Sequence, residues 1–204
     1  MEEKKMLSSA EQFISKLRKL FSNSNDKDKI WSQASIYLQE MLKDPELLNH
    51  SKKWPTSPAK LGLNGKHANL LFYEDPDYGF VINALIKKPN AKTTIHDHGK
   101  SWTLYGVVAG GEEVLRFETS KEINPEDLPS EAKVSETSKV CVGPGYVDFI
   151  KPWEIHAEYN LDEPTVAVIV RSQRCGTYIQ NIYYKNDNSV EQYYGPEQIP
   201  FHLG

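Results

Sequence analysis

The first part of the chain repeats its hydrophobic positions at the three-to-four residue spacing of amphipathic helices. A first helix is predicted over residues 7–21, where Ser8 and Glu11 have the spacing of a capping box. A second helix is predicted from about Asp28, and Asp44-Pro45 opens a short third turn. The pattern therefore predicts a helical segment at the start of the chain.

Beyond Trp54 the pattern changes to short runs of β-branched and aromatic residues, separated by turn residues. Strands are predicted at 70–73, 80–86, 102–108, 113–118, 140–150, 166–171 and 178–184. The polar stretch 119–139 is predicted as a solvated loop with one helical turn. Short strands without intervening helices are typical of an antiparallel sandwich or barrel. We therefore expect a mainly β fold, in which a helical cap (1–53) packs on a barrel (54–204) as one structural unit.

Composition narrows the classes of partner. The 204 residues carry a formal net charge of −4 with scattered Lys and Arg, which argues against binding to nucleic acid or an anionic membrane. No run approaches the ~18 apolar residues of a membrane span, and the N-terminus does not read as an export signal. Cys141 and Cys175 are expected to be free thiols in a reducing cytosol. We expect a cytoplasmic protein, a monomer or homodimer, with a small-molecule substrate.

Three histidines carry the most specific chemical signal. His96 and His98 are separated by one residue, so on a strand both would point to one face and Asp97 to the other. His156 follows a Gly-Pro-Gly turn at 143–145. Three imidazoles that converge inside a small barrel would bind a metal ion and leave coordination positions open. The ligand count does not choose the metal, since three imidazoles also hold zinc with one water.

These residues resemble the cupins, and within them the thiol dioxygenases related to cysteine dioxygenase. The resemblance rests on the segments 94–98, 107–113 and 143–160, and it covers roughly residues 68–172. It implies a double-stranded β-helix, or jelly-roll barrel, and a mononuclear Fe(II) ion held by His96, His98 and His156, with Zn, Mn or Ni as alternatives. Cupins commonly have a glutamate shortly after the histidine pair. This chain has Trp102 and Thr103 there, which favours the three-histidine ligand set of thiol dioxygenases.

The chain departs from the cysteine dioxygenase pattern in its substrate residues. The arginine that clamps the substrate carboxylate in that family is missing from the comparable region, 66–70. A Ser-His-Tyr arrangement of the family would fall on Ala167, Ile169 and Arg171, and the cysteine that some members crosslink would fall near Thr103. These differences argue against cysteine itself as the substrate.

Two arginines and one tryptophan are candidate substrate-binding residues. Arg171 would bind a carboxylate, phosphate or sulfonate group if it points inward, and the alternative is a surface arginine at a strand end. Arg116 is a second candidate cation, although its apolar neighbours do not decide its facing. Trp153 lies close to His156 and is the aromatic residue expected to touch substrate.

The predicted function is a thiol dioxygenase-like enzyme that oxidises a small thiol with O2 to a sulfinate. No catalytic side chain beyond the metal ligands is assigned. Two alternatives stay open: a three-histidine metal cupin that acts on a carbonyl compound as a dioxygenase or isomerase, and a non-enzymatic ligand-binding cupin.

Overall fold

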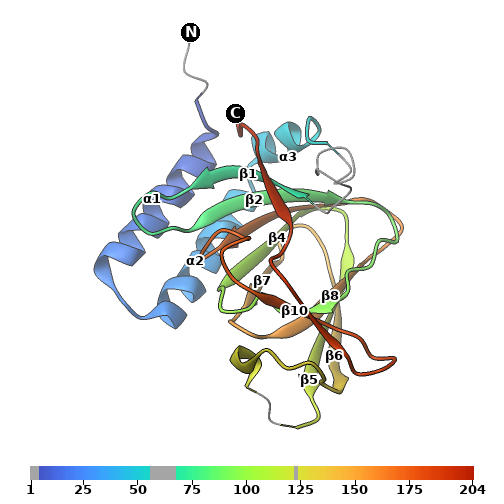
Figure 1. Cartoon of the computed structure of the whole chain (residues 1–204). Helices are drawn as coiled ribbons and strands as arrows, with labels where there is room; N and C mark the ends of the chain where they lie inside the picture. Colours follow the sequence, from blue (N-terminus) through green and yellow to red (C-terminus); the bar gives the residue numbers. More distant parts are fainter. Residues whose placement is uncertain (1–4, 56–67, 122–123) are drawn as a thin grey trace.

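The computed structural model describes residues 5–55, 68–121 and 124–204. Over these residues three α-helices precede two six-stranded β-sheets (Figure 1). The helices lie against one sheet, and the two sheets face each other to form a barrel (Figure 1). The mainly β fold with N-terminal helices is as predicted.

The helices are α1 (Ser8–Asn23), α2 (Lys27–Leu42) and α3 (Pro45–Ser51). Asp26 caps α2 by accepting a hydrogen bond from the N–H of Lys29, and Asp44 caps α3 in the same way. The capping box predicted for the first helix is wrong. Leu7 occupies the N-cap position of α1 without a side-chain bond, and its N–H donates to the carbonyl of Leu203, so the C-terminal segment fixes this helix start.

Each sheet is built from strands that are distant in the sequence. The first sheet runs β12 (Glu197–Pro200), β1 (Ala68–Glu74), β2 (Val81–Lys87), β9 (Thr165–Arg171), β4 (Thr103–Ala109) and β7 (Val147–Ile150). The second runs β11 (Val190–Tyr193), β10 (Gln180–Tyr183), β3 (Ile95–His96), β8 (Ile155–Asn160), β5 (Glu112–Thr119) and β6 (Val134–Val142). Neighbouring strands are antiparallel except β1 and β12, which pair in parallel.

The strand order defines the fold class. The four-strand core β2-β9-β4-β7 belongs to one sheet and β3-β8-β5-β6 to the other. The chain alternates between the sheets from β2 to β5, and β6 to β9 then return along these strands in the reverse order. This arrangement of two interlocked hairpin series is the double-stranded β-helix, or jelly roll, of cupins. The predicted fold class is confirmed.

Alternation along the strands separates two cores. In β4 and β9, Leu104 and Val168 pack with the helices, whereas Tyr105 and Ile169 face the barrel interior. Gly106 of β4 lies close to α2, because a Cβ at this position would meet the side chains of Leu38 and Leu42 at 2.9–3.2 Å. The helical cap is therefore packed directly on the barrel wall.

The predicted strands omit β3, β8, β11 and β12, and they merge parts of two others. The predicted strand 140–150 is instead the end of β6 and the whole of β7, since the Gly143-Pro144-Gly145 turn reverses the chain between them; Gly145 has a φ of +86°. The predicted loop 119–139 contains the expected helical turn, Pro125–Asp127, but it also contains the first half of β6. Residues 135–141 of β6 are all exposed, so this edge strand lacks the alternation that reveals half-buried strands.

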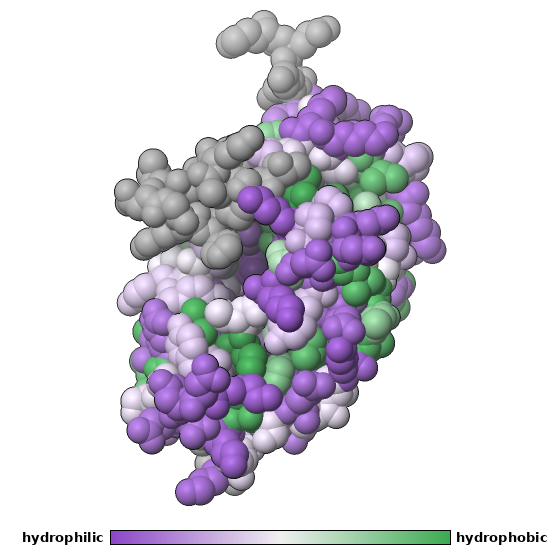
Figure 2. Space-filling model, turned by 90° about the vertical axis from the view of Figure 1, so that its right-hand side faces the viewer, coloured by the Kyte–Doolittle hydropathy of each residue, from purple (hydrophilic) through white to green (hydrophobic). Residues whose placement is uncertain are grey.

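Part of one expectation from the sequence falls on residues that the structure does not describe. Residues 66–67, part of the region compared with the substrate-clamping arginine, and residues 56–67 as a whole lie outside them. No helix in the described ranges has the length and apolar character needed to cross a membrane. On the face in Figure 2, hydrophobic residues occur in small groups among hydrophilic ones.

Replacing Leu38 with Ala tests whether the cap contributes to the stability of the barrel. Leu38 is fully buried against β4, so the change should lower the free energy of unfolding by about 2–5 kcal/mol. Chemical denaturation measures this loss. Ile36→Ala on the same helix is the matched control, because Ile36 is 48% exposed and should cost far less. Equal effects of the two substitutions would contradict the cap–barrel packing.

Candidate metal centre

The three predicted histidines come together inside the barrel. His96 on β3 and His156 on β8 are direct cross-strand partners, and His98 follows His96 just beyond the strand end. Their ring centroids are separated by 4.5–4.9 Å, and one ligand atom from each lies within 4.8 Å of the others. All three rings are buried. This spacing suits a single metal ion bound by three imidazoles.

Hydrogen bonds turn one nitrogen of each ring away from the cluster. Nδ1–H of His96 donates to the carbonyl of Thr94 at 2.9 Å, and Nδ1–H of His156 donates to the carbonyl of Glu154 at 3.3 Å. Nδ1 of His98 lies 3.3 Å from Oε1 of Gln180. Because Nδ1 is the protonated nitrogen when it faces an oxygen acceptor, Nε2 of each ring retains its lone pair for a metal ion.

The protonation states also fit a metal. Burial, with a smaller effect of charge on His156, lowers the pKa of His96 to about 4. Burial lowers the pKa of His98 well below its ordinary value as well. Both rings are therefore neutral near pH 7, which is the form that binds a metal.

Asp97, between the two ligands His96 and His98, fixes this segment of the chain through hydrogen bonds. Its carboxylate is fully buried and faces away from the cluster, as the alternation predicted. It accepts hydrogen bonds from N–H of Gly99 at 2.8 Å, from N–H and Nδ2–H of Asn181 at 3.0 and 2.9 Å, and from the hydroxyl of Tyr183 at 2.8 Å. These bonds fasten the turn that carries His98 to strand β10.

A second connection joins the two segments that provide the ligands. N–H of Trp153 donates to the carbonyl of Gly99 at 2.9 Å. Trp153 has a φ of +66°, which is rare for a bulky residue, and Gly99 has a φ of +54°. A Cβ on Gly99 would lie 2.1 Å from the carbonyl oxygen of Ile179, so only glycine fits at this position. The strained turn before His156 is thus tied to the turn after His98.

Arg171 lies in the same interior as the histidines. Its side chain is buried, and its positive charge contributes to the lowered pKa of His98. Neither Nε nor Nη1 has a hydrogen-bond partner in the part of the chain that the structure describes. Its cross-strand partner Thr103 also has a buried hydroxyl without a partner among those residues. Of the two readings of Arg171 from the sequence, the inward-facing one agrees with the structure.

The environment of Arg171 keeps it charged. Burial disfavours the charged form, but the nearby Cys175, Tyr178 and Tyr193 raise the pKa of Arg171 above its ordinary value. A buried guanidinium without a paired carboxylate is costly, because it has lost water without gaining an anion. An anionic group bound beside Arg171 would therefore offset this cost.

A buried carboxylate, that of Glu158, lies next to His156. Oε1 of Glu158 is 3.4 Å from Nε2 of His156, and Oε2 accepts a hydrogen bond from the hydroxyl of Thr93 at 2.9 Å. Burial alone would raise the pKa of Glu158, but the charges of Lys87 and His156 overcome this effect and hold the pKa well below its usual range. Glu158 is therefore a charged carboxylate beside the cluster.

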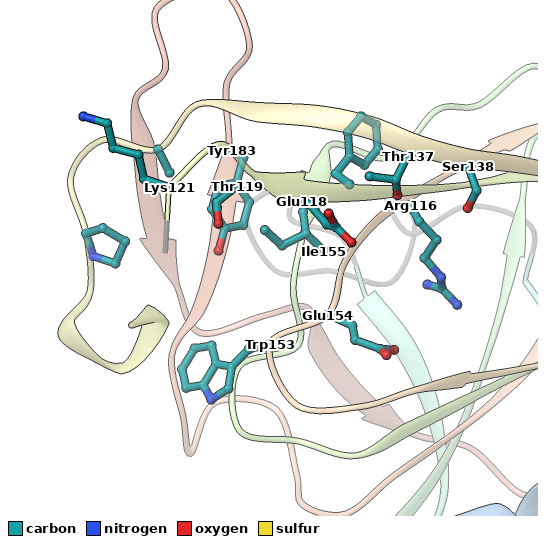
Figure 3. A pocket seen from close by; sticks show the side chains of 13 residues that line it. Arg116, Glu118, Thr119, Lys121, Thr137, Ser138, Trp153, Glu154, Ile155 and Tyr183 are labelled. Atoms are coloured by element: carbon teal, nitrogen blue, oxygen red, sulfur yellow. The ribbon is translucent and has the colours of Figure 1, made fainter. Parts of the chain in front are cut away.

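Arg116 and Trp153 line a pocket beside the cluster. They contribute to a pocket of about 630 Å³ on the β5–β6 side of the barrel, together with the loop before β8 (Figure 3). Arg116 stands on one side of this pocket, and Trp153 and Glu154 stand on the loop opposite (Figure 3). None of the three histidines lines the pocket. Arg116 is the cross-strand partner of His156, and it forms an ion pair with the buried carboxylate of Asp148.

The three substrate-binding candidates are therefore not all in one place. Arg171 and Arg116 both face the interior that holds the histidines, since Arg116 is the cross-strand partner of His156 and pairs with Asp148 of the opposite sheet. Arg116 also lines the adjoining pocket together with Trp153. The sequence analysis missed Glu158 and Gln180. Glu158 could have been found, because it is two residues after His156 on a strand and so shares its face. Gln180 gives no such signal, since only the pairing of β10 with β3 brings it to His98.

Comparison of the sequence with known protein families and with curated proteins gives no match. Among solved structures, the DMSP lyase DddQ from Ruegeria pomeroyi DSS-3 aligns with a TM-score of 0.37 and 15% identity, over 53% of this chain and 45% of that protein. The cupin domain of Schizosaccharomyces pombe Cnp3 aligns with a TM-score of 0.38 and 8% identity, over 52% of this chain and 64% of that one.

A conserved protein with a double-stranded β-helix domain from Klebsiella pneumoniae aligns with a TM-score of 0.34 and 17% identity, over 54% of this chain and 79% of that one. This chain spans about half the length of the first solved structures that it matches. We take the fold from the strand order, not from these partial similarities. The strand order and the three-histidine cluster together support a metal-binding cupin.

Replacing His156 with Ala should abolish stable metal binding, because two imidazoles remain and one of the three ligand atoms is lost. Metal content after reconstitution and desalting, measured by elemental analysis, checks this outcome. His202→Ala is the control, since His202 is an exposed histidine near the C-terminus. Near-normal metal content in His156→Ala would contradict the assignment of the ligands.

The metal-free protein should lose stability as the pH falls from about 6.5 to about 4. His96 has a pKa of about 4 in the folded protein and an ordinary value of 6.5 when unfolded, so the unfolded chain binds more protons in this window. Each pH unit within it costs up to about 1.4 kcal/mol from this residue. Denaturation at several pH values measures the slope, and His96→Gln should reduce it by about one proton. Identical slopes in the two proteins would contradict a buried, neutral His96.

Proposed function

We propose that this chain is a metal-dependent oxygenase of the thiol dioxygenase type, which uses O2 to oxidise a small anionic thiol to a sulfinate. The observation that carries the proposal is a buried guanidinium whose Nε and Nη1 have no partner among the described residues, in the same interior as three buried imidazoles. The first group suits the anionic end of a substrate, and the second suits a metal ion with open positions.

The three histidines would hold the metal. Their Nδ1–H groups are turned to oxygen acceptors, so their Nε2 atoms are oriented toward one point before the metal arrives. When bound, Fe(II) supplies the redox chemistry that joins O2 to a coordinated thiolate, with no other oxidant required. Both oxygen atoms of O2 enter the sulfinate, which balances the reaction of one thiol with one O2.

Arg171 would bind and orient the substrate. An anionic group beside its free Nε and Nη1 would gain two charge-assisted hydrogen bonds and neutralise the buried charge. The hydroxyl of Thr103, on the same face of the barrel, offers a further hydrogen bond. This arrangement would place the thiol end of a short substrate toward the histidines.

The interior wall next to Arg171 is apolar. Ala167 and Ile169 alternate with Arg171 along β9, and they belong to the buried cluster inside the barrel. These side chains would exclude water from the substrate, but they cannot transfer a proton. The thiol proton would therefore pass to water or to a group outside this wall.

A second candidate is a metal cupin that acts on a carbonyl compound. Glu158 favours it by position, because its carboxylate lies 3.4 Å from Nε2 of His156 and so beside the place where a carbonyl compound would bind. The two functions differ in what they consume, since only the first requires both O2 and a thiol.

Protein reconstituted anaerobically with Fe(II) should consume O2 when a thiol with a carboxylate, sulfonate or phosphate group is added, and His156→Ala should not. An oxygen electrode measures this uptake, and mass spectrometry identifies the sulfinate. Arg171→Met should raise the KM for anionic thiols roughly ten- to a hundredfold, because a buried hydrogen bond to a charged group contributes about 1.5–3 kcal/mol.

Arg174→Met is the matched control. Arg174 is a partly exposed arginine three residues along, paired with Glu74, and its removal should leave the kinetics unchanged. Equal KM values for Arg171→Met and Arg174→Met would contradict the role of Arg171. No O2 uptake with any thiol, despite stoichiometric metal, would transfer support to the carbonyl-directed candidate or to a non-enzymatic cupin.

A further inference from the structure

His98 differs from the other two histidines in that the described partner of its Nδ1 is a side chain. His96 and His156 donate their Nδ1–H groups to the backbone carbonyls of Thr94 and Glu154, each of which directly precedes the strand of its histidine. His98 lies beyond the end of β3, and the partner of its Nδ1 is the side-chain amide oxygen of Gln180. The position of that amide therefore decides which nitrogen of His98 faces the cluster.

The amide of Gln180 is itself fixed on three sides. Its oxygen also accepts a hydrogen bond from the hydroxyl of Tyr193 at 3.4 Å, and its nitrogen donates to Sγ of Cys175 at 3.9 Å. A Cβ on Gly195 would lie 2.1 Å from Nε2 of Gln180, so a glycine leaves the space that the amide fills. Reversing the amide would direct its NH2 group at His98 and at a hydroxyl donor, which would break this set of bonds.

The strand register delivers Gln180 to this place. His96 pairs with Ile182, so the antiparallel register brings Asn181 beside Asp97 and Gln180 beside His98. The carboxylate of Asp97 holds both the N–H and the side-chain amide of Asn181. Gln180 is thus held at the level of His98 by a bond that does not involve the histidine.

We propose that Gln180 is the positioning residue of the metal centre: it holds His98 in the Nδ1-protonated form with Nε2 directed at the metal. The inference rests on the metal site of the proposed function, but not on its substrate or on O2. Gln180 does not touch the metal or the substrate. It acts through the ring that it orients, as hydrogen-bond partners of metal-bound histidines do.

The test uses Co(II) bound by the full chain, because Co(II) reports its ligands without turnover. Gln180→Leu removes the acceptor and keeps a similar volume. It should weaken Co(II) binding about 10–100-fold, measured by competition with a chelator. The unaltered Co(II) protein should show three exchangeable, paramagnetically shifted NMR signals, one from each Nδ1–H group, and Gln180→Leu should lose one of them.

Gln198→Leu is the matched control. Gln198 is also a buried glutamine in a strand, but it lies in the sheet that does not carry Gln180. Its amide donates to Asn83 of that same sheet, and no described bond joins it to the three histidines. It should keep both the Co(II) affinity and all three signals. Gln180→Glu keeps an oxygen acceptor at the same position, so it should restore the affinity and the third signal. A loss that reflects only packing would not be restored in this way.

Three outcomes would overturn the proposal. One is an unchanged affinity with all three signals in Gln180→Leu, and another is an equal loss in Gln198→Leu. If Gln180→Leu does not fold, Gln180→Glu decides, because a carboxylate partner makes His98 a stronger donor and should shift the Co(II) absorption bands; unshifted bands are the third. If Gln180→Leu weakens Co(II) binding as expected but the unaltered protein consumes no O2 with any thiol, only the proposed function is overturned, whereas a protein that binds no metal overturns both.

Discussion

The buried carboxylate of Asp97 is the constraint on which the rest of the centre depends. An ionised carboxylate without water is costly, and it persists only when donors surround it. Asp97 obtains four hydrogen bonds, and their donors belong to the turn after His98 and to strand β10. The same bonds that compensate the charge therefore fix the register of β3 against β10 and the course of the chain through both histidines. In this way one residue between two ligands sets the geometry of the whole cluster.

Within the described part of the chain, some buried polar groups of the barrel have hydrogen-bond partners, and others do not. Asp97 and Glu158 have their hydrogen-bond donors or opposite charges at hand, and so hold their positions. Arg171 and Thr103 have polar atoms without hydrogen-bond partners among the described residues. Both side chains are buried inside the barrel rather than exposed to solvent. A fold tolerates such a deficit when a ligand later removes it, which is why unpartnered buried groups are informative about function. Here the charged one of these two residues is a cation, Arg171, and it lies in the same interior as the three histidines.

The sequence predicted those parts of the protein that depend on neighbouring residues in the chain. The helices, a mainly β sandwich or barrel, and the shared facing of His96 and His98 follow from periodicity, turn residues and strand alternation. The jelly-roll class and the set of three histidine ligands came from the family resemblance. The first half of β6 was not predicted because its exposed residues 135–141 show no alternation. The sequence did not decide which way Arg171 faces, because its strand is followed by a loop. Gln180 could not be found, since its role arises only from the pairing of strands that are distant in the sequence.

The pairing of His96 with His156 has a consequence for how the protein is made. The two strands come from opposite halves of the barrel sequence, so the centre is complete only after the late strands have closed on the early ones. Before closure a nascent chain offers only the adjacent pair His96 and His98, which is a weak chelator. Contacts of this kind are slow to form, because the entropy of closing a long loop must be overcome first. A metal ion held by these histidines would therefore be loaded late in folding, and it would stabilise the closed barrel rather than either half of it.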